Sequence, residues 1–171
     1  GSIVGESILL ELAPMMTALV MTGRIGATIA AEIGTMRVTE QIDALEALSF
    51  DPISFLILPR ILAAVVMFPI LVIIADCFGI LGGLFAAVNA MDVSYLEFIR
   101  GLRNWFRPWD AWFGLIKGMF FGLAITSIAC YQGFYTTGGA NGVGRATTST
   151  VVISCVAIVF LDYILAAILL R

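Results

Sequence analysis

Four long apolar runs dominate this chain of 171 residues, at positions 5–33, 52–90, 111–135 and 148–170. A helix needs about 20 mostly apolar residues to cross the hydrocarbon core of a bilayer, which is about 30 Å thick. Each run is long enough. The mean hydropathy of +1.06 and the 12% share of charged residues disfavour the alternative of a very apolar soluble core. We therefore predict an all-α integral membrane protein, a polytopic helical bundle that forms a single domain over residues 1–171.

The run at 52–90 is too long for one upright helix. A single tilted helix that extends past the membrane and is kinked near Pro69 is the preferred interpretation; two re-entrant halves are the alternative. Residues 91–110 are polar and aromatic, with Trp105 and Trp109 inside the stretch and Trp112 just after it. Because tryptophan collects at the headgroup level of membranes, we predict an interfacial segment there.

The stretch at 23–48 changes character halfway. Its first half repeats small residues every four positions, in the pairs Gly23/Ala27, Gly26/Ala30 and Ala30/Gly34, and such spacing lets helices approach closely in lipid. Its second half, 36–48, predicts a short amphipathic helix that is N-capped by Thr39 and ended by Asp51-Pro52. Apolar residues occupy one side of that helix and polar residues the other: Val38, Ile42 and Leu45 against Arg37, Glu40, Gln41, Asp43 and Glu46.

The residue inventory excludes several chemistries. The chain has no histidine, so catalysis by a serine–histidine or cysteine–histidine pair within it is excluded. Cys77, Cys130 and Cys155 stand in apolar runs without paired spacing and are interpreted as small buried hydrophobes. We expect no catalytic residues, no metal site and no cofactor in this chain, and hence no enzyme. The net charge of −3 argues against nucleic acid.

Two blocks carry a resemblance to a known family. The run ELAPMMTALVMTGRIGATIAAEIGTMRVTEQIDAL at 11–45 resembles the signature of the MlaE-type permeases of ABC lipid transporters, and the block GGANGVGRATTSTVV at 138–152 supports it. That family includes permeases of bacterial lipid asymmetry, of mycobacterial cell entry and of chloroplast lipid import. The chain begins where the second membrane helix of such permeases starts, so we expect it to be N-terminally incomplete.

The resemblance implies functional residues and partners. It implies a cytoplasmic coupling helix at 36–48 that docks on an ATPase, with contacts from Glu32, Arg37, Thr39, Glu40, Gln41 and Asp43. It implies a lipid cavity between two protomers, lined by Glu11, Leu12, Met15 and Met16. The implied assembly is a homodimer with two ATPase subunits that bind ATP and Mg, an outer MCE-domain lipid-binding protein and, in some members, a small regulatory subunit. The implied substrate is phospholipid, with sterol as an alternative in mycobacterial relatives. The implied location is the bacterial inner membrane, with the chloroplast inner envelope as the alternative.

The orientation involves a conflict. The family places 36–51 in the cytoplasm and 91–110 outside, whereas the latter carries Arg100, Arg103 and Arg107 and the former only Arg37. Positive charges favour the cytoplasmic side, so counting them predicts the opposite orientation. We keep the family orientation. Helical rise then places Glu11, Lys117 and Asp162 in one layer of the outer half of the membrane.

Charges within membrane helices are functional candidates. We predict that Lys117 pairs with Asp162 and leaves Glu11 as a spare carboxylate; a single ion network that fixes helix packing is the alternative. Arg24 is assigned to the same intramembrane charge network, in a structural role, and lies too far from Glu32 to pair with it.

The glycine-rich stretch TTGGANGVGRATT is predicted to be a cytoplasmic loop, with Arg145 near headgroups or the ATPase. Its spacing mimics a phosphate-binding loop, but Arg145 and Ala146 replace the required residues, so nucleotide binding is rejected. Two other function classes remain as alternatives to the permease: a secondary transporter or channel, and a non-transporting membrane scaffold.

Overall fold

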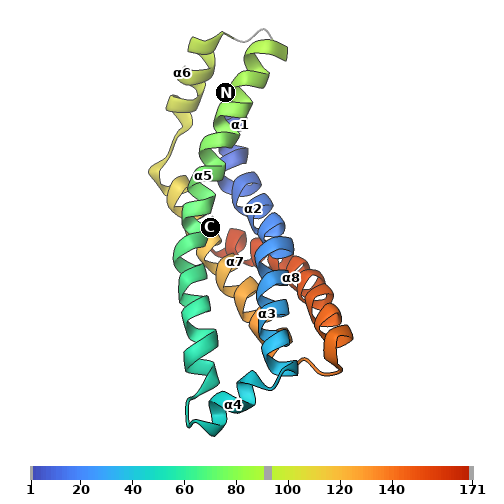
Figure 1. Ribbon diagram of the computed structural model, residues 1–171. Helices are drawn as coiled ribbons and strands as arrows, with labels where there is room; N and C mark the ends of the chain where they lie inside the picture. Colours follow the sequence, from blue (N-terminus) through green and yellow to red (C-terminus); the bar gives the residue numbers. More distant parts are fainter. Residues whose placement is uncertain (1, 91–93, 170–171) are drawn as a thin grey trace.

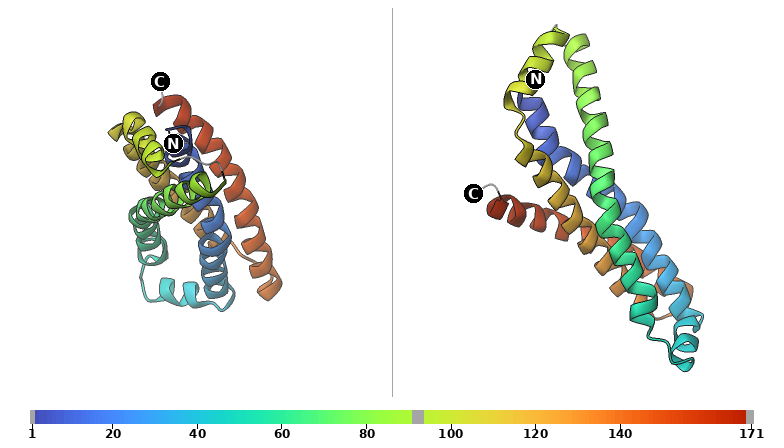
Figure 2. Two further views of the ribbon diagram at one scale, coloured as in Figure 1. Left: turned by 90° about the horizontal axis from the view of Figure 1, so that it is seen from above. Right: turned by 90° about the vertical axis from the view of Figure 1, so that its left-hand side faces the viewer.

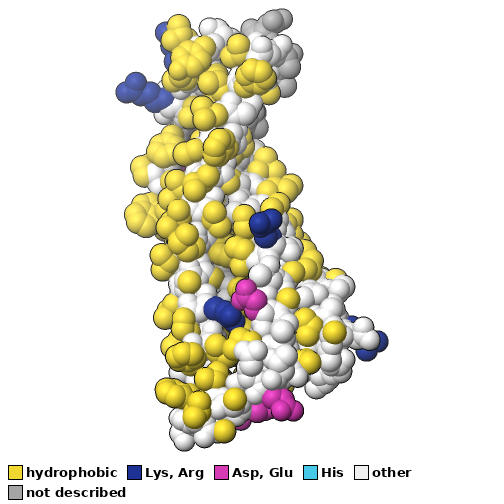
Figure 3. Space-filling model, in the orientation of Figure 1, with side chains coloured by type: hydrophobic (Ala, Val, Ile, Leu, Met, Phe, Trp, Pro, Cys, Tyr) yellow, Lys and Arg dark blue, Asp and Glu magenta, His cyan; other side chains and the backbone are white. Residues whose placement is uncertain are grey.

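The computed structural model describes residues 2–90 and 94–169, and these form helices joined by short turns, with no strand among them. Four helices are long and apolar enough to cross a membrane: Gly5–Val38, Ile53–Asn89, Pro108–Phe134 and Gly139–Leu169. Large apolar side chains cover much of the outer surface (Figure 3), as expected for a protein whose solvent is lipid. The predicted all-α polytopic membrane protein is confirmed.

The first membrane helix is continuous but not uniform. It consists of α1 (Ser2–Ser7), the π-helical segment η1 (Ile8–Leu12), α2 (Ala13–Met21), a second π-helical segment η2 (Thr22–Gly26) and α3 (Ala27–Val38). Pro14, which has no N–H, stands four residues after Leu10, so the Leu10 carbonyl lacks its ordinary helical donor. The Leu10 carbonyl is therefore available to another part of the chain.

The short helix α4 (Gln41–Ala47) lies across the ends of α3 and the next membrane helix (Figure 1). Its amphipathic character agrees with the sequence pattern, because Ile42 is fully buried beside Ile33 and Cys130. The predicted N-cap is wrong. Thr39 ends α3 and its hydroxyl donates back to the Thr35 carbonyl, while Glu40, in a left-handed conformation (φ 60°), stands at the N-cap of α4.

Asp51 begins the next helix rather than ending α4, contrary to the prediction. The chain leaves α4 at Leu48 and turns through Ser49, which has φ 63°. The Asp51 carboxylate then accepts the amide of Ile53 and both the amide and the hydroxyl of Ser54. These hydrogen bonds, led by that of the Ser54 hydroxyl, lower the pKa of Asp51, because they favour its charged form.

The second membrane helix is a single element. The segment η3 (Ile53–Ile57) continues into α5 (Leu58–Ala90), which contains Pro69. The 37 residues of Ile53–Asn89 span about 55 Å, far more than the hydrocarbon core. The structure thus has one long helix in place of two re-entrant halves.

The remaining helices are α6 (Tyr95–Trp105), α7 (Pro108–Phe134) and α8 (Gly139–Leu169). Most of the predicted interfacial segment is α6, with a capping box between Ser94 and Glu97; residues 91–93 lie outside the described part of the chain. The predicted glycine-rich loop is wrong in extent. Only residues 135–138 separate α7 from α8. Gly138 in this turn and Gly139 at the start of α8 have φ values of 91° and 65°, which suit glycine.

The helix α7 lies at the centre of the bundle and packs against α3, α5 and α8 (Figures 1 and 2). Glycines make this packing close: a Cβ on Gly122 would lie 2.8 Å from Phe68, and one on Gly133 would lie 2.9 Å from the Ala30 carbonyl oxygen. Of the small residues predicted to mediate packing, Gly26, Ala30 and Gly34 are buried, and Gly26 faces Ile125 and Thr150. Gly23 is exposed, contrary to the prediction. The cysteines are free thiols; Cys130 is buried, but Cys77 is exposed, contrary to its interpretation as a buried residue.

We predict that Gly133→Ala destabilises the bundle by about 1–3 kcal/mol, because the new methyl group meets backbone atoms of α3. The matched control is Gly23→Ala, where nothing lies within 4 Å of the new Cβ. Thermal unfolding of the detergent-solubilised protein, followed by circular dichroism, measures both variants. Equal stability of the two would contradict the predicted close approach of α7 and α3.

Candidate functional site

A fully buried lysine joins three membrane helices. The Lys117 ammonium on α7 lies 2.8 Å from a Glu11 carboxylate oxygen on η1 and 2.8 Å from an Asp162 carboxylate oxygen on α8. It also donates a hydrogen bond to the Leu10 carbonyl at 3.1 Å and lies over the Phe113 ring, 4.7 Å from its centroid. Every nearby group is therefore electron-rich, as an ammonium removed from water requires.

This cluster corrects the prediction for Glu11. The expected pair between Lys117 and Asp162 is present, but Glu11 is no spare carboxylate, because it contacts the same ammonium. The two acids differ in exposure: the Asp162 side chain is 17% exposed and that of Glu11 is 43% exposed. Glu11 therefore links the buried ammonium to the outer surface of the bundle.

The other residues proposed to line a lipid cavity do not all share one surface. Leu12 and Met16 are exposed beside Glu11, whereas Met15 packs against the core cluster that contains Ala18 and Phe121. Of the four residues, Glu11, Leu12 and Met16 thus reach the surface of the bundle, and Met15 does not.

Arg24 does not belong to the charge cluster, contrary to its assignment. It lies on η2, about 20 Å along the helix from Glu11, and its side chain is exposed. Among the described residues, no carboxylate lies within ion-pair distance of it.

Glu32, in contrast, has a partner that the sequence reasoning missed. Arg60 on α5 donates a hydrogen bond to the Glu32 carboxylate at 3.1 Å. The two residues stand near the end of one membrane helix and near the start of the next. In a pair of antiparallel helices such positions face each other, and this signal was available in the sequence.

Side chains at the end of α3 bond the polar face of α4. The Arg37 guanidinium bonds Asp43 at 2.8 Å and lies over the Phe134 ring of α7, and the Gln41 amide donates to the Thr39 hydroxyl at 3.0 Å. Glu40, Gln41, Asp43 and Glu46 are all exposed. The end of the bundle formed by α4 thus presents an acidic surface.

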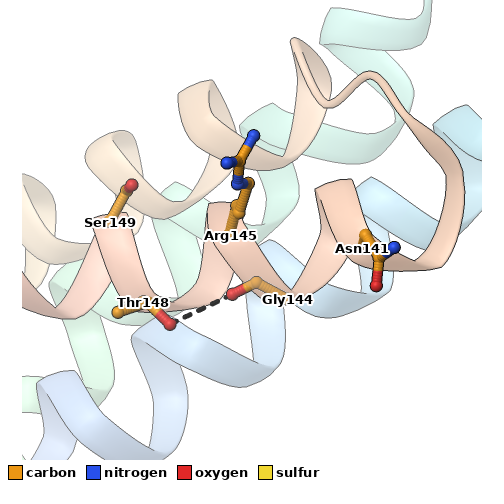
Figure 4. Close-up of a pocket in the computed structure, with 5 residues that line it drawn as sticks. All are labelled: Asn141, Gly144, Arg145, Thr148 and Ser149. Atoms are coloured by element: carbon orange, nitrogen blue, oxygen red, sulfur yellow. Dashed lines mark hydrogen bonds between the residues drawn. The ribbon is translucent and has the colours of Figure 1, made fainter.

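Arg145 lies on the first turns of α8, rather than in a loop, and lines an open groove of about 800 Å³ (Figure 4). Its side chain points away from the helix, as does that of Ser149, while the Thr148 hydroxyl donates to the Gly144 carbonyl at 3.1 Å. The residues around it are Asn141, Gly144, Thr148 and Ser149.

These features define a class: a polytopic helical membrane protein with an ion cluster inside its bundle and an acidic amphipathic helix at one end. The family model described as Permease MlaE matches residues 1–168, and the chain belongs to the MlaE permease family.

Three relatives illustrate the match. A probable ABC transporter permease protein of Rickettsia prowazekii is 44% identical over 96% of this chain and 64% of its own length. The protein TRIGALACTOSYLDIACYLGLYCEROL 1, chloroplastic, of Arabidopsis thaliana is 38% identical over 98% of this chain and 48% of its own. The intermembrane phospholipid transport system permease protein MlaE of Haemophilus influenzae is 38% identical over 99% of this chain and 65% of its own. The chain thus spans less than two thirds of the length of these relatives.

We predict that Lys117→Met destabilises the protein by about 3–5 kcal/mol, because it leaves two partly buried carboxylates, those of Glu11 and Asp162, without their cation. Adding Asp162→Asn should recover part of the loss. Arg24→Met, which removes an exposed cation, is the control and should change stability by about 0.5 kcal/mol or less. Thermal unfolding in detergent measures all three; a loss in Arg24→Met as large as that in Lys117→Met would contradict the prediction.

Proposed function

We propose that this chain is part of the permease subunit of an ABC transporter that moves phospholipid, driven by ATPase subunits that dock on α4. The observation that carries the proposal is the exposed acidic face of α4, which follows directly on the end of the first membrane helix. The printed names of the relatives support the class, since one is a permease of an intermembrane phospholipid transport system and another a probable ABC transporter permease.

The mechanism is mechanical coupling. Closure of two ATPase subunits, which bind ATP and Mg, pushes on α4 and on the adjoining end of α3. The proposed contacts are Arg37, Thr39, Glu40, Gln41 and Asp43. Glu32, which the family resemblance also assigns to this contact, is bonded to Arg60 on α5. Arg37 on α3 bonds Asp43 of α4 and lies over Phe134 of α7. A push on α4 is therefore transmitted to the first membrane helix. The same helix carries Glu11 at its other end, so the motion acts on the Lys117 cluster. The π-helical segment η1 contains Glu11 and η2 lies between it and α4, which supports this role because such segments are frequent at functional sites.

The lipid site is proposed at the exposed surface of Glu11, Leu12 and Met16, with Met15 beneath it. Apolar and flexible side chains suit acyl chains of varied shape, and a carboxylate offers a polar contact for a headgroup. We propose that two copies of the permease form the cavity as a homodimer. An MCE-domain lipid-binding protein receives or delivers the phospholipid on the outer side, and in some systems a small regulatory subunit binds the ATPase.

The proposed location is the bacterial inner membrane, with the chloroplast inner envelope as the alternative. A secondary transporter or channel is less well supported, because such a protein needs charges along a continuous water path. Here the Lys117 cluster, Arg24 and the Glu32–Arg60 pair are separate from one another. A scaffold would have no use for the acidic face of α4.

Reversing the charge of α4 tests the proposal. We expect Glu40→Arg/Asp43→Arg to abolish co-purification of the ATPase subunit with the permease, because both side chains are exposed. The change costs little stability, since the Arg37–Asp43 pair that it breaks is exposed and such pairs contribute about 0–1 kcal/mol.

The control is Glu6→Arg, which reverses an exposed charge on α1, at the opposite end of the first membrane helix. Retention of the ATPase by the control and its loss from the double variant support the proposal. Absence of any ATPase from the unaltered complex at native expression would refute it and favour the channel or the scaffold.

A further inference from the structure

The helix α6 carries arginines on the side that faces away from the bundle. Its inner side packs through Phe98, which is 2% exposed, and through Leu102, which lies against α1. Arg100 and Arg103 lie about 140–160° around the helix from Phe98 and are exposed. Arg107, in the connection to α7, is exposed as well. We call these three arginines the arginine patch; no carboxylate among the described residues lies within ion-pair distance of it.

Apolar side chains lie next to the arginine patch. Leu96, Ile99 and Phe106 are 61%, 39% and 51% exposed. Figure 3 shows Lys and Arg side chains beside hydrophobic ones at the end of the molecule that carries α6. Surfaces that bind proteins are enriched in arginine and in large apolar and aromatic groups. The arginine patch and its apolar neighbours thus have the composition of a protein-binding surface rather than that of a surface that meets only water.

The helix α6 lies beyond the level at which α7 enters the membrane. Gly118 of α7 is level with Pro69 of α5, since a Cβ on Gly118 would lie 3.4 Å from the Pro69 Cα atom. The two helices are antiparallel, so the last turns of α5 extend about 15 Å past Pro108, where α7 begins. Trp109 and Trp112 at that point are exposed and mark the headgroup level. Figures 1 and 2 show α6 beside the extension of α5, so most of α6 stands above the bilayer surface.

The charge of this segment calls for an anionic partner. In the proposed function α4 faces the cytoplasm, so α6, at the opposite end of the bundle, faces the outer side. Arginines are disfavoured on that side of a membrane protein, and the three of the arginine patch repel one another without an acid beside them. A guanidinium binds a carboxylate through paired hydrogen bonds, so an acidic protein surface complements the patch.

We propose that the exposed face of α6 docks an acidic surface of a protein on the outer side of the membrane. Arg100 and Arg103 pair with carboxylates of that protein, and Leu96 and Ile99 supply the apolar contacts. The inference rests on the proposed function, which sets the orientation and places an MCE-domain protein on the outer side. It assigns that protein a contact on α6, separate from the Glu11 surface and from the ATPase contact on α4.

Photo-crosslinking of the whole complex in its membrane tests the proposal. The photoreactive amino acid p-benzoylphenylalanine is placed at Asn104, which is exposed on α6, or at Asn141, which is exposed at the opposite end of the bundle. We expect an adduct with the MCE-domain protein, identified by mass spectrometry, at Asn104 and not at Asn141. Arg100→Glu/Arg103→Glu should reduce this adduct about tenfold or more, because it replaces attraction by repulsion, and raised salt should weaken the adduct of the unaltered chain.

The control is Glu6→Arg, which changes an exposed charge at the same end of the molecule in the opposite sense and should leave the adduct in place. Thermal unfolding in detergent checks that the double variant remains folded. An Asn104 adduct that is insensitive to Arg100→Glu/Arg103→Glu, or one formed with lipid alone, would overturn the proposal. Absence of the MCE-domain adduct from a complex that retains its ATPase overturns this inference alone. An adduct of Asn104 with the ATPase would instead refute the orientation, and with it the proposed function.

Discussion

The ammonium of Lys117 is wholly removed from solvent, and three helices are arranged around it. An unpaired charge in this position would be strongly unfavourable, so the neighbouring acids and the carbonyl oxygen must all be in place when the helices pack. Glu11 and Leu10 come from the first membrane helix and Asp162 from the last. The cluster thus fixes the axial positions of η1 and α8 relative to α7. The close glycine contacts of α7 are made in this same arrangement.

Much of this arrangement follows from sequence. The spans follow from apolar length, and the Lys117–Asp162 pair follows from helical rise once an orientation is chosen. The amphipathic pattern also places Ile42 inward and Glu40 outward on α4. These features depend only on the spacing of residues along the chain, which can be read from the sequence.

Other features depend on local backbone geometry, which spacing does not reveal. The glycine-rich stretch suggested a loop, but in a packed bundle glycine also serves close approach: a Cβ at Gly142 would collide with the Thr137 carbonyl. Threonine is a residue type favoured at helix N-caps, yet the Thr39 hydroxyl donates to the Thr35 carbonyl in the last turn of α3. The pairing of Glu32 with Arg60 could have been found by aligning antiparallel helices. The contact of Lys117 with Glu11, in contrast, depends on the π-helical backbone of η1, which the sequence pattern does not show.

The π-helical segments also bear on how related chains are aligned. A π-helical turn accommodates one more residue than the α-helical turn it replaces, so η1 and η2 act as insertions that add no loop. Successive residues of a helix differ in direction by about 100°. A relative with one residue fewer between positions 8 and 12 would therefore either rotate its upstream segment by that angle or direct a different side chain at the lysine. An alignment based on sequence similarity alone can place the corresponding gap a few residues away from the π-helical turn. Every residue between the true and the assigned position of the gap is then paired with the wrong residue of the relative.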